Sequence, residues 1–272
     1  MDKYREANRE LWNNWANINA ASKTYDVEAF RQGKSSLNPL ELEEVGDVAG
    51  KTLLHLQCHF GKDTLTWARM GATVTGADFS DRAIEIARRL SAEIGVPATF
   101  VLSDLYNLPN ALTGQFDIVF TSYGALSWLP DIRGWARVVA HFLKPGGMFY
   151  VADFHPFAYV FENEENGEGL HVVYAYENLP DSPLRFETQG NYADSEADYK
   201  GVEYGWNHPL GDIVTALTDA GLRIEFLHEQ RYSVDGAMFK GLERSEDGYY
   251  RLKDPILREA IPLMFSIKAW RE

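Results

Sequence analysis

The sequence has almost no cysteine: Cys58 is the only one in 272 residues. A single thiol excludes a disulfide within the chain and a metal site built from several cysteines. Long apolar runs are missing too, and no segment approaches the roughly 18 apolar residues that a membrane-spanning helix needs. Residues 1–8 are polar and lack the apolar stretch of a secretory signal. We therefore expect a cytoplasmic protein that does not enter the membrane. No cluster of His, Asp and Glu has the spacing of a metal site either, so no metal ion is predicted.

Basic residues are also scarce. The chain has 26 Lys and Arg against 40 Asp and Glu, which gives a formal net charge of −14. Proteins that bind nucleic acid rely on clustered Lys and Arg to contact phosphates, and no dense basic block occurs here. The balance disfavours nucleic acid as a partner and favours a small-molecule ligand.

What the sequence does have is a regular alternation of short apolar runs and helical segments. The runs cover residues 52–58, 73–79, 98–104, 116–123 and 148–154, with helices predicted at 61–70, 80–94 and 131–143. Continuously apolar runs are typical of strands that are covered on both faces. Their alternation with helices predicts an α/β fold with a doubly wound, mostly parallel sheet and helices on both faces.

Two regions depart from this pattern. Residues 1–45 are helical and rich in aromatic residues, with Trp12 and Trp15 on one helical face. This segment either packs on a core or forms a lid over a pocket. Residues 155–205 hold an acidic loop at 162–168 and two segments, 171–176 and 184–189, that we expect to pair as a hairpin.

The α/β pattern resumes after residue 205, with a helix at 211–220 and strands at 222–229 and 263–270. We therefore predict an N-terminal helical lid over residues 1–45. A single domain follows over residues 46–272, with an inserted cover at about 155–205 between the fifth and sixth strands.

Acidic residues end three of the apolar runs: Asp78, Asp104 and Asp153. In a doubly wound sheet, ligands bind beyond the carboxyl ends of the strands, near the switch in strand order. Isolated carboxylates at buried strand ends are costly unless a donor pairs with them. Ribose hydroxyls and an adenine amino group are suitable donors.

Five segments carry a resemblance to a known family: residues 53–61, 76–80, 101–104, 116–120 and 143–147. In these segments the chain resembles the class I S-adenosylmethionine-dependent methyltransferases, and most of all a subgroup of uncharacterised bacterial small-molecule enzymes. The Lys-Pro-Gly-Gly phrase at 144–147, with Asp78 and Asp104, is the most specific part. The resemblance implies a Rossmann-like, seven-stranded sheet and S-adenosylmethionine as the cofactor.

The resemblance also implies roles for individual residues. Asp78 would accept hydrogen bonds from both ribose hydroxyls, and Asp104 with the Leu105 backbone would meet the adenine. The full set of cofactor-binding candidates is Gln57, Cys58, His59, Gly61, Asp78, Phe79, Ser80, Asp104, Leu105, Thr121 and Tyr123.

The first loop departs from the family pattern, which has an acidic residue followed by three glycines at alternate positions. His55, Gln57 and His59 occupy the first three of these positions, and only Gly61 is kept. A dinucleotide-binding fold is the competing interpretation, because Asp78 is placed almost as well for the ribose of NAD. The absence of Gly-x-Gly-x-x-Gly and the presence of Lys-Pro-Gly-Gly favour the methyltransferase.

Methyl transfer from a sulfonium is an in-line displacement, so the protein mainly holds the nucleophile close to the methyl carbon. A base is needed only if the acceptor must lose a proton. The catalytic candidates are His155, His208 and Tyr123, although either histidine could instead be structural. Aromatic residues near the expected pocket supply the acceptor-binding candidates: Tyr25, Trp128, Tyr204 and Trp206.

The sequence therefore predicts an enzyme that transfers a methyl group from S-adenosylmethionine to O, N or C of a small molecule, as a monomer or homodimer. A cofactor-binding module or sensor without catalysis is the main alternative, because of the altered glycine loop. A tRNA or protein methyltransferase and an NAD-dependent oxidoreductase are less favoured. The patterns do not identify the acceptor.

Overall fold

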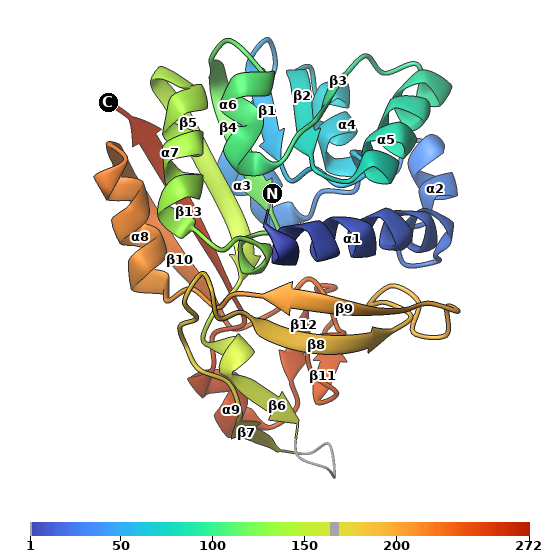
Figure 1. Cartoon of the computed structure of the whole chain (residues 1–272), viewed down its shortest axis with the longest axis vertical. Helices are drawn as coiled ribbons and strands as arrows, with labels where there is room; N and C mark the ends of the chain where they lie inside the picture. The colour runs from blue at the N-terminus through green and yellow to red at the C-terminus, as the bar shows by residue number, and fades with distance from the viewer. Residues whose placement is uncertain (1, 164–168) are drawn as a thin grey trace.

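The computed structural model describes residues 2–163 and 169–272. Its centre is a seven-stranded sheet in the order β10-β13-β5-β4-β1-β2-β3 (Figure 1). The strands are β1 (Thr52–Leu56), β2 (Thr73–Asp78), β3 (Thr99–Leu102), β4 (Phe116–Ser122), β5 (Leu143–Phe154), β10 (Leu222–Gln230) and β13 (Met264–Arg271). Strands β1 to β5 pair in parallel, and β13 is antiparallel to both of its neighbours. The predicted doubly wound, mostly parallel sheet is confirmed.

Helices cover both faces of the sheet because successive strand residues point to opposite sides and both sets are apolar. Val119 packs with α7 (Ile132–Phe142) and α8 (Leu210–Asp219) on one face. On the other, Phe120 packs with Trp67 of α4 (Lys62–Arg69) and near α3 (Pro39–Val45). The helix α5 (Asp81–Ile94) begins where the Ser80 hydroxyl accepts the Ala83 N–H, and it ends at a left-handed Gly95.

The strand order reverses at β1, which lies between β2 and β4. The loops that follow β1, β2, β3 and β4 therefore meet at one edge of the sheet, where a ligand site is expected. Short helices follow two of these strands, namely η1 (Leu105–Asn107) with α6 (Leu108–Ala111) after β3, and η2 (Leu126–Trp128) after β4.

The N-terminal segment forms α1 (Lys3–Ala21), α2 (Val27–Arg31) and α3. Helix α1 lies across the carboxyl edge of the sheet, with the hairpin of β8 (Leu184–Gln189) and β9 (Lys200–Gly205) on its other side (Figure 1). The Asn8 amide exchanges hydrogen bonds of 2.7 and 2.9 Å with the Tyr204 backbone in that hairpin. On the opposite side, the Ser80 hydroxyl donates to Asn13 at 2.7 Å. Helix α1 thus bridges the sheet and the insertion.

The predicted hairpin of residues 171–176 with 184–189 is wrong. Strand β8 (Leu184–Gln189) pairs with β9 (Lys200–Gly205), and β7 (Leu170–Val172) pairs with β6 (Phe161–Asn163). The pairing of β9 depends on α1, which is distant in sequence and which it contacts through Asn8. Of the acidic stretch predicted as a loop, residues 162 and 163 belong to β6, and 164–168 lie outside the described residues.

A second insertion, which the sequence did not indicate, joins β10 to β13. It contains β11 (Leu242–Arg244), β12 (Tyr250–Leu252) and α9 (Pro255–Ala260). Phe239, Leu252 and Ile261 from this segment pack with Ala158 in a small core of their own. The two insertions thus share a core beyond the sheet edge. No helix in residues 2–163 or 169–272 has the length and apolar character to cross a bilayer.

Candidate functional site

Asp78 is almost fully buried at the end of β2 and links two loops. Its Oδ2 accepts the His59 N–H at 2.8 Å, and its Oδ1 accepts the Ser80 N–H at 2.9 Å. Burial raises the pKa of this carboxyl to about 6, while the backbone N–H groups oppose the shift. The carboxylate is therefore ionised at neutral pH and held in one orientation at the switch point of the sheet.

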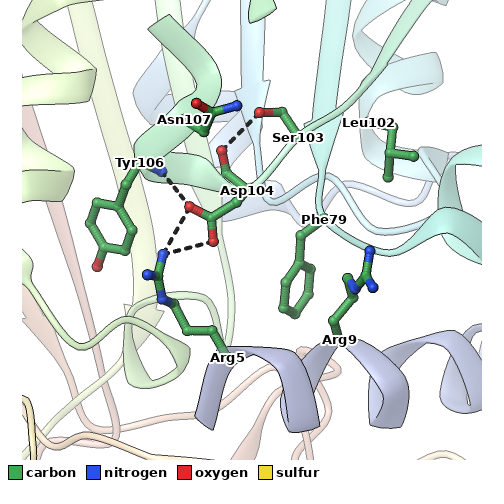
Figure 2. Close-up of a pocket in the computed structure, with 8 residues that line it drawn as sticks. All are labelled: Arg5, Arg9, Phe79, Leu102, Ser103, Asp104, Tyr106 and Asn107. Carbon is green, nitrogen blue, oxygen red and sulfur yellow. Dashed lines mark hydrogen bonds and ion pairs between the residues drawn. The ribbon is translucent and has the colours of Figure 1, made fainter. Parts of the chain in front are cut away.

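A pocket of about 500 Å³ opens beside this edge. Figure 2 shows its lining: Arg5, Arg9, Phe79, Leu102, Ser103, Asp104, Tyr106 and Asn107. Two of the predicted cofactor residues, Phe79 and Asp104, face each other across it. Asp104 accepts the Tyr106 N–H at 3.0 Å. Aromatic walls and a carboxylate suit a flat ring that carries an amino donor.

The loop after β1 has the backbone of a glycine-rich loop without its glycines. Gln57 and His59 have φ angles of +56° and +52°, and Gly61 has +80°. Non-glycine residues rarely adopt this left-handed region, and such strain concentrates at functional sites. The three positions that hold glycine in the family thus keep the glycine conformation. At Gly61 a Cβ would lie 2.6 Å from the Phe100 ring, so no other residue fits.

Only one of the two polar atoms in the Gln57 side chain has a hydrogen-bond partner among the described residues. Its Nε2 donates to the Ala125 carbonyl at 2.8 Å, which fixes the orientation of the amide. Its Oε1 is buried and has no hydrogen-bond partner among the described residues. A buried acceptor of this kind is costly unless a donor reaches it. Gln57 therefore fits a ligand that presents an N–H donor to the loop after β1.

The left-handed backbone at Gln57 can be tested by two substitutions at that position. We expect Gln57→Gly to be more stable to urea than Gln57→Ala by about 1 kcal/mol, because only alanine keeps a Cβ at positive φ. Both variants lose the amide, so each is the control for the other. Equal unfolding free energies would show that the loop is not strained.

Aromatic rings meet where α1 crosses the loops after β1 and β4. This aromatic cluster consists of Trp12, Trp15, Tyr25, His59, Trp128 and Tyr192. The Trp12 ring lies 5.2 Å from both His59 and Trp128, and the Tyr25 ring lies 5.5 Å from His59. Burial lowers the pKa of His59 to about 3, so its imidazole is neutral. The cluster presents aromatic edges and faces beside an uncharged histidine, which suits a cation.

The remaining cofactor candidates have mainly packing roles in the structure. Cys58 is buried, and its Sγ lies 2.8 Å from where a Cβ on Gly76 would be. Burial raises the pKa of this thiol, so it is protonated. Leu105 packs in the core, and the Thr121 hydroxyl is fully buried without a partner among the described residues.

Tyr123 follows β4 and points toward α3. Its hydroxyl donates to Glu41 Oε2 at 2.5 Å. Burial raises the pKa of Glu41 to about 7 and also raises the pKa of Tyr123. The Glu41 carboxyl can therefore gain or lose a proton near neutral pH, and it lies beside Tyr123 near the end of β4.

Both candidate histidines have partners within the chain. His155 Nδ1 accepts the Phe157 N–H at 3.0 Å, and its Nε2 therefore donates to Glu229 at 2.9 Å. His208 lies just before α8, and its Nε2 donates to the Leu129 carbonyl at 2.6 Å. Both ring nitrogens of His155 are therefore engaged, whereas the Leu129 contact engages only Nε2 of His208.

The four acceptor-binding candidates divide into two groups. Tyr25 and Trp128 belong to the aromatic cluster. Trp206 is buried and donates to the Pro180 carbonyl at 3.1 Å. Tyr204 instead contacts the Tyr4 ring at 4.9 Å, at the start of α1.

Comparison with known proteins matches residues 53–147 to a family described as "Methyltransferase domain". Over these residues the chain is similar to known methyltransferase domains. The match covers the strands and loops that hold Gln57, Asp78 and Asp104, and it ends before the insertions.

Curated relatives agree over the same part of the chain. The ubiquinone biosynthesis O-methyltransferase of Proteus mirabilis is 33% identical over 131 residues, which is 47% of this chain and 53% of that protein. The enzyme of the same name from Escherichia coli O127:H6 is 32% identical, over 47% of this chain and 54% of its own length. The chain thus spans about half the length of these relatives.

Solved structures share the fold over most of the chain. An S-adenosylmethionine-dependent methyltransferase from Mesorhizobium loti has a TM-score of 0.56 and 19% identity, covering 89% of this chain and 100% of its own. Another from Clostridium acetobutylicum has a TM-score of 0.57 and 14% identity, covering 96% and 99%. At this identity the likeness shows the fold alone.

The sequence did not single out Arg5 or Tyr192. Arg5 lines the pocket from α1, and Tyr192 joins the aromatic cluster from the insertion. Both lie far from the methyltransferase domain in sequence. No local motif marks them, because only the folded positions of α1 and the β8–β9 hairpin bring them to the site.

Proposed function

We propose that this chain transfers a methyl group from S-adenosylmethionine to a small-molecule acceptor. The observation that carries the proposal is the position of Asp78 next to the pocket that Phe79 and Asp104 line. All three residues lie at or after the carboxyl ends of the adjacent strands β2 and β3. Both carboxylates already accept hydrogen bonds within the chain, and ribose hydroxyls and an adenine amino group are donors that their remaining lone pairs can accept. The methyltransferase match over the same loops supports it.

Different residues would bind different parts of the cofactor. Asp78 would hold the ribose, and Phe79 with Asp104 the adenine. Gln57 Oε1 would accept from the ammonium of the methionine end, which meets the need of a buried acceptor. The cofactor supplies an activated methyl group on a sulfonium. His59, which is neutral, adds no positive charge beside that cation.

The acceptor would lie against the aromatic cluster. The chain's task there is to exclude water and align the nucleophile, which is the main source of rate in such a displacement. The names of the curated relatives favour an oxygen nucleophile, and the rings of Tyr25 and Trp128 favour a flat acceptor. Roles for Tyr123, His155 and His208 in catalysis stay proposals. A cytoplasmic location and a lid formed by residues 1–45 also stay predictions.

The test is methyl transfer by the full chain. The chain is incubated with methyl-labelled S-adenosylmethionine and a panel of phenols, catechols and amines, and labelled products are identified by mass spectrometry. We expect labelled ether products. A thermal-shift titration with S-adenosylmethionine and NAD runs beside it, because a ligand stabilises only the state that binds it. Stabilisation by NAD alone would refute the proposal.

Cofactor affinity should depend on pH through Asp78. Hydroxyl donors bind the ionised carboxylate, and the pKa of Asp78 in the free protein is about 6. We expect the Kd of S-adenosylhomocysteine to be constant above pH 7 and to rise below pH 6, by up to tenfold per pH unit. Calorimetry between pH 5 and 8 checks this. Asp78→Asn is the control and should remove the dependence. A flat profile in the unaltered chain would contradict the assignment.

A further inference from the structure

Helix α1 supplies one wall of the adenine pocket. Arg5 and Arg9 reach the pocket from this helix, while the other lining residues come from the end of β3 and from the loops after β2 and β3 (Figure 2). The family match begins at residue 53, so this wall lies outside the methyltransferase domain. The pocket is thus completed by a segment that the domain itself does not contain.

Arg5 is held from several sides. Its Nη1 donates to both oxygens of Asp104, at 2.9 Å each, and its Nε donates to Asp2 at 2.7 Å. Its guanidinium also lies over the Tyr106 ring, 5.0 Å from the centroid. Asp2 is the N-cap of α1, so the arginine is braced by its own helix. A planar guanidinium fixed in this way is a rigid partner for a carboxylate.

The contacts on Asp104 leave room for one more donor. Its Oδ1 accepts from Arg5 and from the Tyr106 N–H, whereas among the described residues its Oδ2 accepts from Arg5 alone. A carboxylate oxygen can accept about two hydrogen bonds. The open position on Oδ2 suits an amino group, and Arg5 prevents the carboxylate from turning away from it.

We propose that Arg5 is a positioning residue for the nucleoside: it orients Asp104 from α1, so that the pocket selects a base with an exocyclic amino group. This inference rests on the proposed function. It makes α1 part of the cofactor site, and it gives residues outside the methyltransferase domain a share in cofactor selectivity.

The experiment measures the affinity of the full chain for S-adenosylhomocysteine by calorimetry. Arg5→Met should weaken binding about tenfold, because the Asp104 carboxylate would no longer be held in place and would have to be ordered when the ligand binds. Arg5→Lys should restore part of the affinity, since it keeps the charge but not the planar fork. Arg133→Met is the matched control: it removes an exposed ion pair to Asp219 away from the pocket and should leave the affinity unchanged.

A second readout separates positioning from mere support of the fold. The unaltered chain should bind adenosine more tightly than inosine, whose carbonyl oxygen replaces the amino donor. Arg5→Met should reduce this preference for adenosine. A substitution that only loosens helix α1 should lower the affinity for both nucleosides equally.

The outcomes are distinguishable. If the unaltered chain fails to bind S-adenosylhomocysteine, the proposed function and the inference both fall. If it binds and Arg5→Met binds equally or more tightly, only the inference falls. An unchanged preference for adenosine in Arg5→Met would also overturn it. A circular-dichroism melt of each variant shows that the compared chains are folded.

Discussion

Replacing Asp153 by alanine should destabilise the protein by roughly 3–5 kcal/mol, because it removes the acceptor of several buried backbone donors. The carboxylate is 2% exposed at the end of β5. It accepts the N–H groups of Ala125 and Leu126 at 3.1 and 2.9 Å, that of Phe154 at 2.7 Å, and that of Gly124. It therefore holds the loop after β4, where η2 begins. The loss is measured as the difference in the free energy of unfolding in urea, with the same m-value for the variant and the unaltered chain.

Asp131→Ala is the matched control for this substitution. Asp131 is also an aspartate that accepts a backbone N–H, from Gly134 at 2.8 Å, but it caps α7 at a half-exposed position. Loss of such a cap costs about 1 kcal/mol. If Asp153→Ala costs no more than Asp131→Ala, then Asp153 does not anchor the loop, and its burial needs another reason.

Replacing Asp78 by alanine should weaken binding of S-adenosylhomocysteine by about 10- to 100-fold. A charge-assisted hydrogen bond contributes about 1.5–3 kcal/mol, and a factor of ten in affinity corresponds to about 1.4 kcal/mol. The substitution also removes the acceptor of the His59 N–H, so the left-handed loop after β1 loses its tie to β2. Calorimetry at pH 7.5 measures the affinity, at which pH the carboxyl of the unaltered chain is ionised.

Asp117→Ala separates a loss of binding from a loss of stability. Asp117 lies in β4 and accepts the Thr52 N–H at 2.8 Å and the Lys144 ammonium at 2.8 Å. These contacts hold its pKa at about 2, and none of them involves the pocket. The variant should be less stable but bind the ligand as tightly as the unaltered chain. Unchanged affinity in Asp78→Ala would remove that residue from the cofactor site.

The central sheet could be predicted from the sequence because strand and helix periodicities are local. The strands predicted at 73–79 and 98–104 correspond to β2 and β3, with Asp78 ending the first and Asp104 following the second. The carboxyl ends of parallel strands meet at one edge, so the two acids were predicted to be close without knowledge of the packing. The altered glycine loop was also visible, although its left-handed backbone was not.

The hairpins of the insertion could not be predicted in this way. Short strands of mixed polarity fit several partners, and the choice is made by what they pack against. Strand β9 is placed by Asn8 of α1, and the segment after β10 is placed by a core shared with Ala158. Neither contact leaves a signal in the local sequence.

Local patterns along the chain were enough to predict the α/β sheet, the resemblance to methyltransferases and the acids Asp78 and Asp104. Packing between distant segments was needed to show that α1 brings Arg5 to Asp104, that His155 is bonded to Glu229, and that Gln57 keeps an open acceptor. Those features join segments far apart in the chain. Their partners are chosen by shape and hydrogen bonding in the folded state, which no spacing along the sequence encodes.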